Sequence, residues 1–287
     1  MGNITEAFVQ QFADNFMHVA QQKKSRFERA VSVDAGIVGM SKSVNRLGQR
    51  TAQRRLTRHG DSPINDQQHS TRYVDLFDWE DGDMIDDQDK IRMLVDPTSD
   101  DVQAMVAGLN RAKDDVIISA FGGSARSSTG AIALPSTQKI AANSGGLTKA
   151  KIIAARARFR ANEADEEAGE DLYIGYSSAA LQDVLSDTTL TSADYMAAKM
   201  LQEGTLNGKW LGFTWIPSER FPVDSSSNRL LYAWAKSGVK LGIGKDITTR
   251  VGERADKGFN VQIYGKMSIG SVRVEEEKVV EIACTES

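Results

Sequence analysis

The chain is poor in the residues that build most catalytic and metal sites. It holds one cysteine, Cys284, and three histidines among 287 residues. This excludes a disulfide framework and leaves no paired ligands for structural zinc. The sequence also has no Gly-x-Ser-x-Gly motif, no phosphate loop with Gly-Lys-Ser/Thr and no cysteine–histidine nucleophile pair. We therefore expect no catalytic residue, no cofactor and no metal site.

Long apolar runs are absent as well. No run reaches the ~18 residues that a membrane span needs. The first basic residue is Lys23, so the basic start of a secretory signal is missing. We expect no membrane partner and a product that stays in the cytoplasm where it is made. With 40% hydrophobic residues, the chain can still bury a core and has room for about two domains.

The net charge of −4 hides two blocks of opposite sign. Residues 1–60 hold ten Lys and Arg against four Asp and Glu, a balance of +6. Residues 61–101 hold three against thirteen, a balance of −10. Such blocks are usually solvated faces. The alternative is that each block meets the opposite sign on a neighbouring copy of the chain.

Two segments of the positive block could contact a partner. Residues 3–30 are typical of an amphipathic helix, which either joins the core or docks as an arm on another subunit; its apolar side carries Phe8, Phe12 and Phe16. Residues 42–58 place cations every four positions, a spacing that fits one face of a helix or of a strand. Helix, hairpin and loop all remain open here, and nucleic-acid binding is a rival interpretation without an aromatic residue for base stacking. These cations are Lys42, Arg46, Arg50, Arg54 and Arg58.

The centre of the sequence predicts a long helix over residues 97–121. Apolar side chains recur every three or four positions from Val102 to Ala120, Asp96 can cap the start, and Gly122 with Gly123 ends it. At 1.5 Å per residue the helix would span roughly 37 Å. It is long enough to act as a spine along which other elements pack.

A compact α/β unit and then β-structure are predicted after the spine. The glycine- and serine-rich residues 122–130 indicate a hairpin turn or linker, and alternating apolar residues between Val239 and Cys284 predict half-buried strands with a turn at residues 275–277. We expect this terminal sheet to pack back on the spine. In between, the patterns predict helices over residues 147–169, 179–185 and 192–203, and strands over residues 171–176 and 209–216.

Three segments in this order resemble the major capsid proteins of tailed bacteriophages with the Hong Kong-97 (HK-97-like) fold. They are FDWEDGDMIDD with the spine after it, LGFTWIPSERFP, and the ending from WAKSGVKLGIGKDITTRVGERADKGFN to EIAC. The resemblance covers most of residues 70–285 and implies an α+β fold. The implied parts are an N-terminal arm (1–35), an extended E-loop hairpin (36–75), a peripheral domain with the spine (76–145) and return strands (251–287), and an inserted α/β axial domain (146–250).

The resemblance implies a structural protein, not an enzyme, that self-assembles into an icosahedral bacteriophage head around double-stranded DNA. Its partners would be itself, in hexamers and pentamers, DNA without sequence specificity, and separate scaffolding, portal and decoration proteins. It would be a virion protein assembled in the cytoplasm of a host bacterium. The alternatives are an encapsulin-type nanocompartment, a nucleic-acid-binding protein or an enzyme.

A hairpin that reaches over a neighbouring subunit would bring the five cations of residues 42–58 to that neighbour's acidic block, because like elements in a closed ring meet head to tail. The acidic stretch of residues 75–89 lacks the spacing of a calcium loop, so we expect no metal there. We expect its carboxylates to face the basic hairpin instead; they include Asp83, Asp86 and Asp87.

Overall fold

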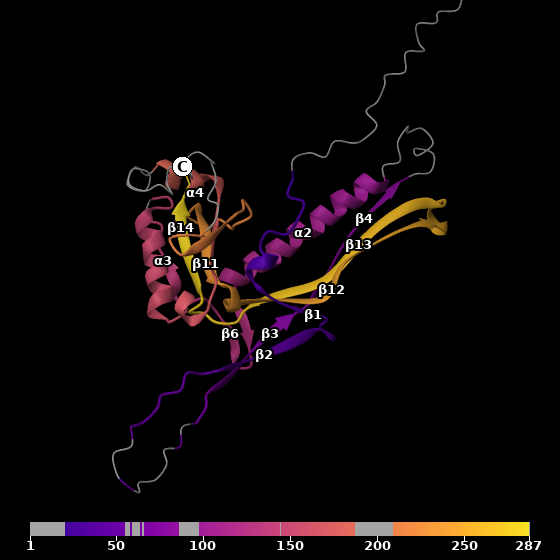
Figure 1. Ribbon diagram of the computed structural model, residues 1–287. Helices are drawn as coiled ribbons and strands as arrows, with labels where there is room; N and C mark the ends of the chain where they lie inside the picture. The colour runs from indigo at the N-terminus through magenta and orange to yellow at the C-terminus, as the bar shows by residue number, and fades with distance from the viewer. Residues whose placement is uncertain are drawn as a thin grey trace, which may run out of the picture. The chain divides into compact units, whose positions relative to one another are not determined.

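The computed structural model describes residues 21–54, 58, 64, 66–85, 98–143, 145–186 and 209–286 (Figure 1). The predicted helix over residues 192–203, Asp86, Asp87 and the three phenylalanines of the predicted arm lie outside the described residues. The chain divides into two compact units. The smaller comprises Met1–Ser25, Asp78–Ala112 and Lys245–Ser268, and the larger comprises Arg26–Phe77, Lys113–Gly244 and Ile269–Ser287.

The predicted spine is confirmed as α2 (Thr98–Gly122). Asp100 and Asp101 lie in its first turn, where the helix dipole stabilises their negative charges. Its end is closed by a hydrogen bond of 2.9 Å from the Gly123 amide to the Ser119 carbonyl. Of the predicted apolar stripe, Met105, Leu109 and Ile117 are buried, and the other members are half-buried. Ile118 and Phe121, outside the predicted stripe, are buried as well.

One four-stranded sheet has the order β1-β12-β13-β4. Within the smaller unit, α2 packs on one face of β13, because a Cβ at Gly265 would lie 2.6 Å from the Met105 sulfur (Figure 1). β1 pairs in parallel with β12, and β4 is an edge strand. The strands are β1 (Ser32–Ala35), β4 (Phe77–Ile85), β12 (Val239–Arg254) and β13 (Asn260–Arg273).

A six-stranded sheet of order β7-β14-β11-β8-β10-β9 forms the centre of the larger unit, with α3 beside it in Figure 1. Trp234 of β11 is fully buried and packs on Phe121 at 4.4 Å between ring centroids. The elements are β7 (Lys139–Ile140), α3 (Lys149–Ala161), β8 (Leu172–Tyr176), α4 (Ser178–Ser186), β9 (Lys209–Trp210), β10 (Phe213–Pro217), β11 (Asn228–Ala235) and β14 (Val279–Thr285). The predicted strand at 171–176 and helix at 179–185 are confirmed as β8 and α4.

A third sheet has the order β2-β3-β5-β6. β5 and β6 pair around Ser127 and Gly130, so the glycine- and serine-rich segment is a hairpin turn. β2 and β3 are antiparallel over seven residue pairs, from Ser41 with Asp75 to Leu47 with His69. The strands are β2 (Ser41–Leu47), β3 (His69–Asp75), β5 (Ala125–Ser127) and β6 (Gly130–Ile132).

The helix predicted over residues 147–169 was too long. α3 ends at Ala161, and Glu163 adopts a left-handed conformation with φ of 52° that stops the helix. Asp165 then caps a short 3-10 helix (Glu166–Ala168), and its carboxylate accepts a 2.8 Å hydrogen bond from Arg160. The acidic residues therefore begin a new turn instead of ending α3, so the helix dipole is not opposed.

Three further predictions were wrong in part. The strand over residues 209–216 is a hairpin, because Leu211 and Gly212 both have positive φ, as a two-residue turn requires. Residues 21–27 are irregular and are followed by a 3-10 helix (Glu28–Ala30), so the predicted N-terminal helix does not reach residue 30. β14 lies with β11 and not with the return strands. Its first four residues, Val279, Val280, Glu281 and Ile282, are all buried, so both faces of the strand are covered, which suits the middle of a covered sheet.

The N-terminal segment of the described chain is bound to the second half of α2 in the larger unit. The buried Asp114 carboxylate accepts hydrogen bonds from the backbone amides of Arg26, at 3.0 and 3.2 Å, and of Phe27, at 3.4 Å. The Phe27 ring is fully buried against the rings of Phe121, Phe221 and Trp234. Arg26 and Phe27 are therefore anchored on the core of the larger unit.

Candidate assembly surfaces

The basic segment is a β-hairpin at its base. β2 and β3 carry its first and last parts, and the pairing continues through a 2.8 Å hydrogen bond from the Gly48 amide to the Gln68 carbonyl. The choice between helix and hairpin is thus decided for residues 41–47. Val44 in β2 and Thr71, Tyr73 and Val74 in β3 are residue types that favour strands over helices.

The five predicted cations separate into two groups. Lys42 pairs with Asp34 at 2.7 Å, and this hydrogen bond lowers the pKa of the Asp34 carboxyl. Arg46 pairs with Glu276 at 3.3 Å and with Glu275 at 3.7 Å. The structure therefore places both cations of the base on carboxylates of their own chain.

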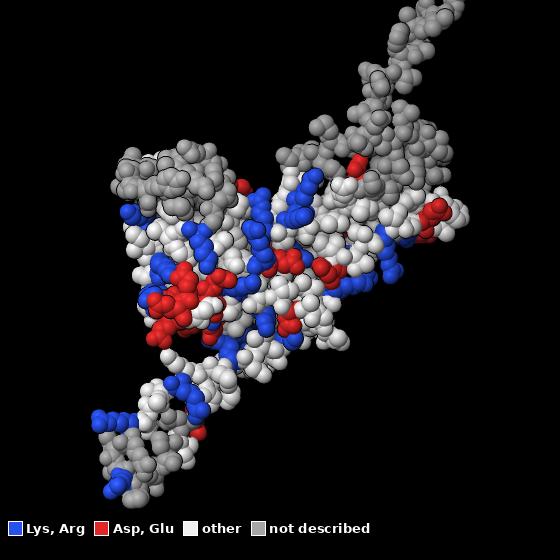
Figure 2. Space-filling model, viewed as in Figure 1, with Lys and Arg blue, Asp and Glu red and all other residues white. Residues whose placement is uncertain are grey.

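The other three cations lie beyond the strands. Arg50, Arg54 and Arg58 are exposed. Figure 2 shows blue side chains on this extension of β2 and β3, away from the body of the larger unit. Their exposure leaves these three side chains accessible to a neighbouring subunit.

The acidic stretch forms the edge strand β4. Its first eight residues are all exposed, and they include Asp78, Glu80, Asp81 and Asp83. The Asp83 carboxylate accepts a 2.7 Å hydrogen bond from the adjacent Met84 amide. Asp75 just before it pairs with Arg126 at 3.1 Å. The sequence indicated the carboxylates here but not the strand.

β4 also exposes large apolar side chains that sequence reasoning missed. Phe77 is 64%, Trp79 39% and Met84 37% exposed. An edge strand presents unpaired backbone groups, and charges along it discourage unselective pairing. An edge that combines carboxylates with apolar rings is suited to a partner that carries cations and apolar side chains. The signal in the sequence was the alternation of carboxylates with Phe77 and Trp79.

Glu276 forms the centre of a buried ionic cluster at the base of the hairpin, which sequence reasoning read only as a turn. Its carboxylate accepts hydrogen bonds from Arg72 of β3 at 3.0 and 3.1 Å and from Arg46 of β2 at 3.3 Å. The Arg273 Nε lies 4.0 Å away. Arg72, Arg273 and Glu276 are all buried.

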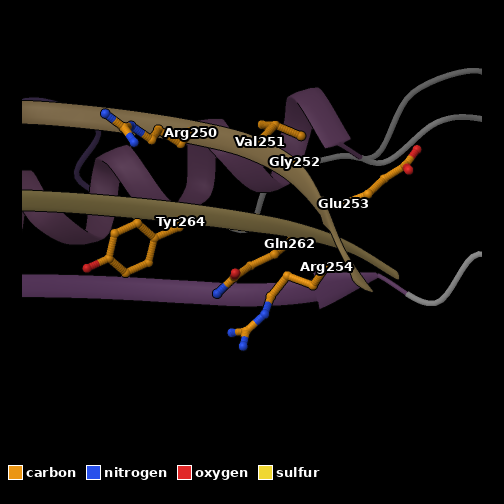
Figure 3. Close-up of a pocket in the computed structure, with 7 residues that line it drawn as sticks. All are labelled: Arg250, Val251, Gly252, Glu253, Arg254, Gln262 and Tyr264. Carbon is orange, nitrogen blue, oxygen red and sulfur yellow. The ribbon is translucent and has the colours of Figure 1, made fainter. Parts of the chain in front are cut away.

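The hairpin between β12 and β13 carries a shallow hollow (Figure 3). Arg254 there pairs with Asp256, and Tyr264 donates its hydroxyl hydrogen to Glu80 of β4. The pairing raises the pKa of Arg254, and the Glu80 hydrogen bond raises the pKa of Tyr264. The hollow is lined by Arg250, Val251, Gly252, Glu253, Arg254, Gln262 and Tyr264. These side chains form no arrangement of nucleophile and base.

Within the described residues, no group of three or more His, Cys, Asp and Glu side chains is placed to hold a metal ion. In the same part of the chain, no helix has the length and apolar character of a membrane span. The arrangement of the described surfaces suits contacts between protein subunits better than chemistry on a small molecule.

Comparison with solved structures shows the same fold in phage capsids. The capsid of the cyanophage P-SCSP1u matches with a TM-score of 0.72 at 18% identity, over 100% of this chain and 96% of that one. The capsid of Ralstonia phage GP4 has a TM-score of 0.72 at 10% identity, over 99% and 97%. The capsid of cyanophage Pam1 has a TM-score of 0.71 at 14% identity, over 100% of this chain and 99% of that one. The predicted α+β fold of the Hong Kong-97 type is confirmed.

A search of curated proteins gives no match. The profile of the phage capsid protein family matches residues 4–286. The matches give no support to a nanocompartment, a nucleic-acid-binding protein or an enzyme. Because the match covers nearly the whole chain, the chain belongs to the phage capsid protein family, and it is a structural major capsid protein of the virion that assembles with its own copies into an icosahedral shell.

Proposed function

We propose that the shell built from this chain encloses double-stranded DNA and that its subunits join through the hairpin. One observation carries the proposal: a single chain exposes a cationic hairpin extension and an anionic edge strand. Identical copies can then meet head to tail, which closes rings of five or six. The N-terminal arm, E-loop, peripheral and axial domains expected from the sequence are the parts of this subunit.

The energetics favour an effect on assembly over an effect on folding. Exposed ion pairs contribute about 0–1 kcal/mol each, so three of them contribute at most about 3 kcal/mol per contact. Repetition at every subunit boundary makes this sum decisive for a closed shell. The same three side chains are exposed within the subunit, and their loss leaves its core unchanged.

The surrounding system follows from the same proposal. DNA is bound through its phosphates without sequence specificity, since no described element resembles a base-reading module. Separate proteins supply scaffolding, the portal and any decoration, and assembly takes place in the cytoplasm of the host bacterium.

The test is charge reversal at Arg50, Arg54 and Arg58 to glutamate. We expect an unchanged circular dichroism spectrum and thermal transition but no shells at ~0.15 M salt. The matched control reverses three exposed cations elsewhere, Lys236, Lys245 and Lys257, and should assemble. Additional reversal of Asp78, Asp81 and Asp83 to lysine should restore assembly in part. Normal shells from the hairpin variant would contradict the proposed contact, and intact shells that lose DNA would assign the cations to the genome.

A further inference from the structure

The hairpin of β2 and β3 has few attachments to the larger unit. Among the described strands outside the hairpin, only β5 pairs with it, through Arg72 of β3 and Ser127 of β5. Val74 of β3 also packs with Ala125 and Val272 in a small buried cluster. Two partly exposed ion pairs, Lys42 with Asp34 and Asp75 with Arg126, add to these contacts. Exposed pairs contribute little to stability, so together these contacts leave the direction of a long two-stranded ribbon weakly determined.

The Glu276 carboxylate supplies a buried attachment, and it holds both strands at once. Arg46 and Arg72 belong to different strands, and each donates to this carboxylate. The Arg46 guanidinium is mostly buried, and that of Arg72 almost completely. A rotation of the ribbon about its base would lengthen at least one of these hydrogen bonds.

Arg273 connects the same centre to the frame of the unit. It is fully buried, and its two terminal nitrogens donate to the carbonyls of Phe121 and Gly123, at 2.8 and 2.7 Å, and of Ile132, at 2.9 Å. These carbonyls belong to the end of α2 and to β6. Arg273 therefore cannot follow the hairpin, and it fixes one side of the cluster.

The charges make Glu276 indispensable to this arrangement. Three guanidinium groups surround it, and their Nε atoms are buried without a hydrogen bond in the described part of the chain. Burial, together with the charge of Arg72, lowers the pKa of Arg273. Glu275 is no substitute, because it lies against Arg46 at 3.7 Å and against Lys278 at 2.9 Å. Without the Glu276 charge, Arg72 of the hairpin and Arg273 of the frame would repel each other.

We infer that Glu276 is a positioning residue: its carboxylate fixes the direction in which the β2–β3 hairpin leaves the subunit and so presents Arg50, Arg54 and Arg58 to a neighbour. The presentation of these arginines to a neighbour rests on the proposed function, whereas the fixed direction of the hairpin does not.

The direction can be measured on dispersed subunits by electron–electron double resonance. Spin labels are attached at Ala52→Cys on the hairpin and Ala150→Cys on α3, with the buried Cys284 changed to alanine. Both labelled positions are exposed and lie in the larger unit. The parent should give one narrow distance distribution. Glu276→Gln should lose it and give a broad one, whereas Glu277→Gln, the same change at the exposed neighbouring residue, should keep it.

Assembly and a second variant separate the possible outcomes. If Glu276→Gln does not fold, Arg72→Gln/Glu276→Gln removes the repulsion and should fold while keeping the broad distribution. A narrow distribution in the folded variants overturns the inference. A broad distribution with slower assembly supports both proposals. A broad distribution with normal assembly supports the role of Glu276 and contradicts the hairpin contact. A narrow distribution together with failed assembly of the triple-glutamate variant contradicts the role of Glu276 and supports the hairpin contact.

Discussion

Asp114 offers the sharpest test of how the N-terminal segment is held on the spine. Its carboxylate is completely buried and binds the backbone amides of Arg26 and Phe27. Hydrogen bonds to a charged group contribute about 1.5–3 kcal/mol each. Asp114→Ala removes two of them and gains about 0.5 kcal/mol of helix propensity. We expect the free energy of unfolding to fall by roughly 3–5 kcal/mol.

The assay is urea unfolding followed by tryptophan fluorescence, because Trp234 packs on Phe27 at 5.7 Å and reports release of the segment. Asp115→Ala is the matched control: it is the next residue, gains the same helix propensity, and loses an ion pair with Arg220 whose side chains are 35% and 41% exposed. That pair contributes about 0–1 kcal/mol. Equal losses in the two variants would refute the assignment of Asp114 as the clamp.

Two further predictions concern the larger unit. Burial raises the pKa of the Cys284 thiol from 9.0 to about 11. The protonated thiol therefore stabilises the fold fully below pH 9, and this contribution is lost between pH 9 and 11. Urea unfolding at pH 10 should show a free energy of unfolding lower by about 1.4 kcal/mol than at pH 8, a loss that Cys284→Ala does not show. In β13, a Cβ at Gly270 would lie 1.8 Å from the Asp75 carbonyl oxygen, so Gly270→Ala should lower the thermal midpoint by the equivalent of about 1–3 kcal/mol or more. Gly252→Ala, with nothing within 4 Å of its Cβ, should leave the midpoint nearly unchanged.

Local patterns in the sequence predicted the elements whose stability comes from their own periodicity. The spine α2 was predicted to within one residue at each end, because its apolar stripe and its terminal glycines are local signals. Strand β8 followed for the same reason. The β5–β6 turn is one of the two structures, hairpin turn or linker, that its glycines and serines left open. The end of α3 was missed since Asp165, Glu166 and Glu167 continue a helix-like composition, and only the left-handed Glu163 shows the break.

Features that depend on distant contacts were not available from the pattern. Alternation predicted β14 as a strand but could not say that it pairs with β11. The ionic cluster joins residues 46, 72, 273 and 276, which are up to 230 positions apart in the sequence. The spacing showed five equivalent cations in residues 42–58. In the fold, Lys42 and Arg46 pair with carboxylates of their own chain, whereas Arg50, Arg54 and Arg58 are exposed on the extension of the hairpin.

This chain is the building block of a shell. Light scattering and electron microscopy of the purified full chain, over a range of concentration and salt, test it most directly. We expect closed shells, or pentamers and hexamers that convert to shells as concentration rises. A folded protein that stays a monomer under all of these conditions would contradict it.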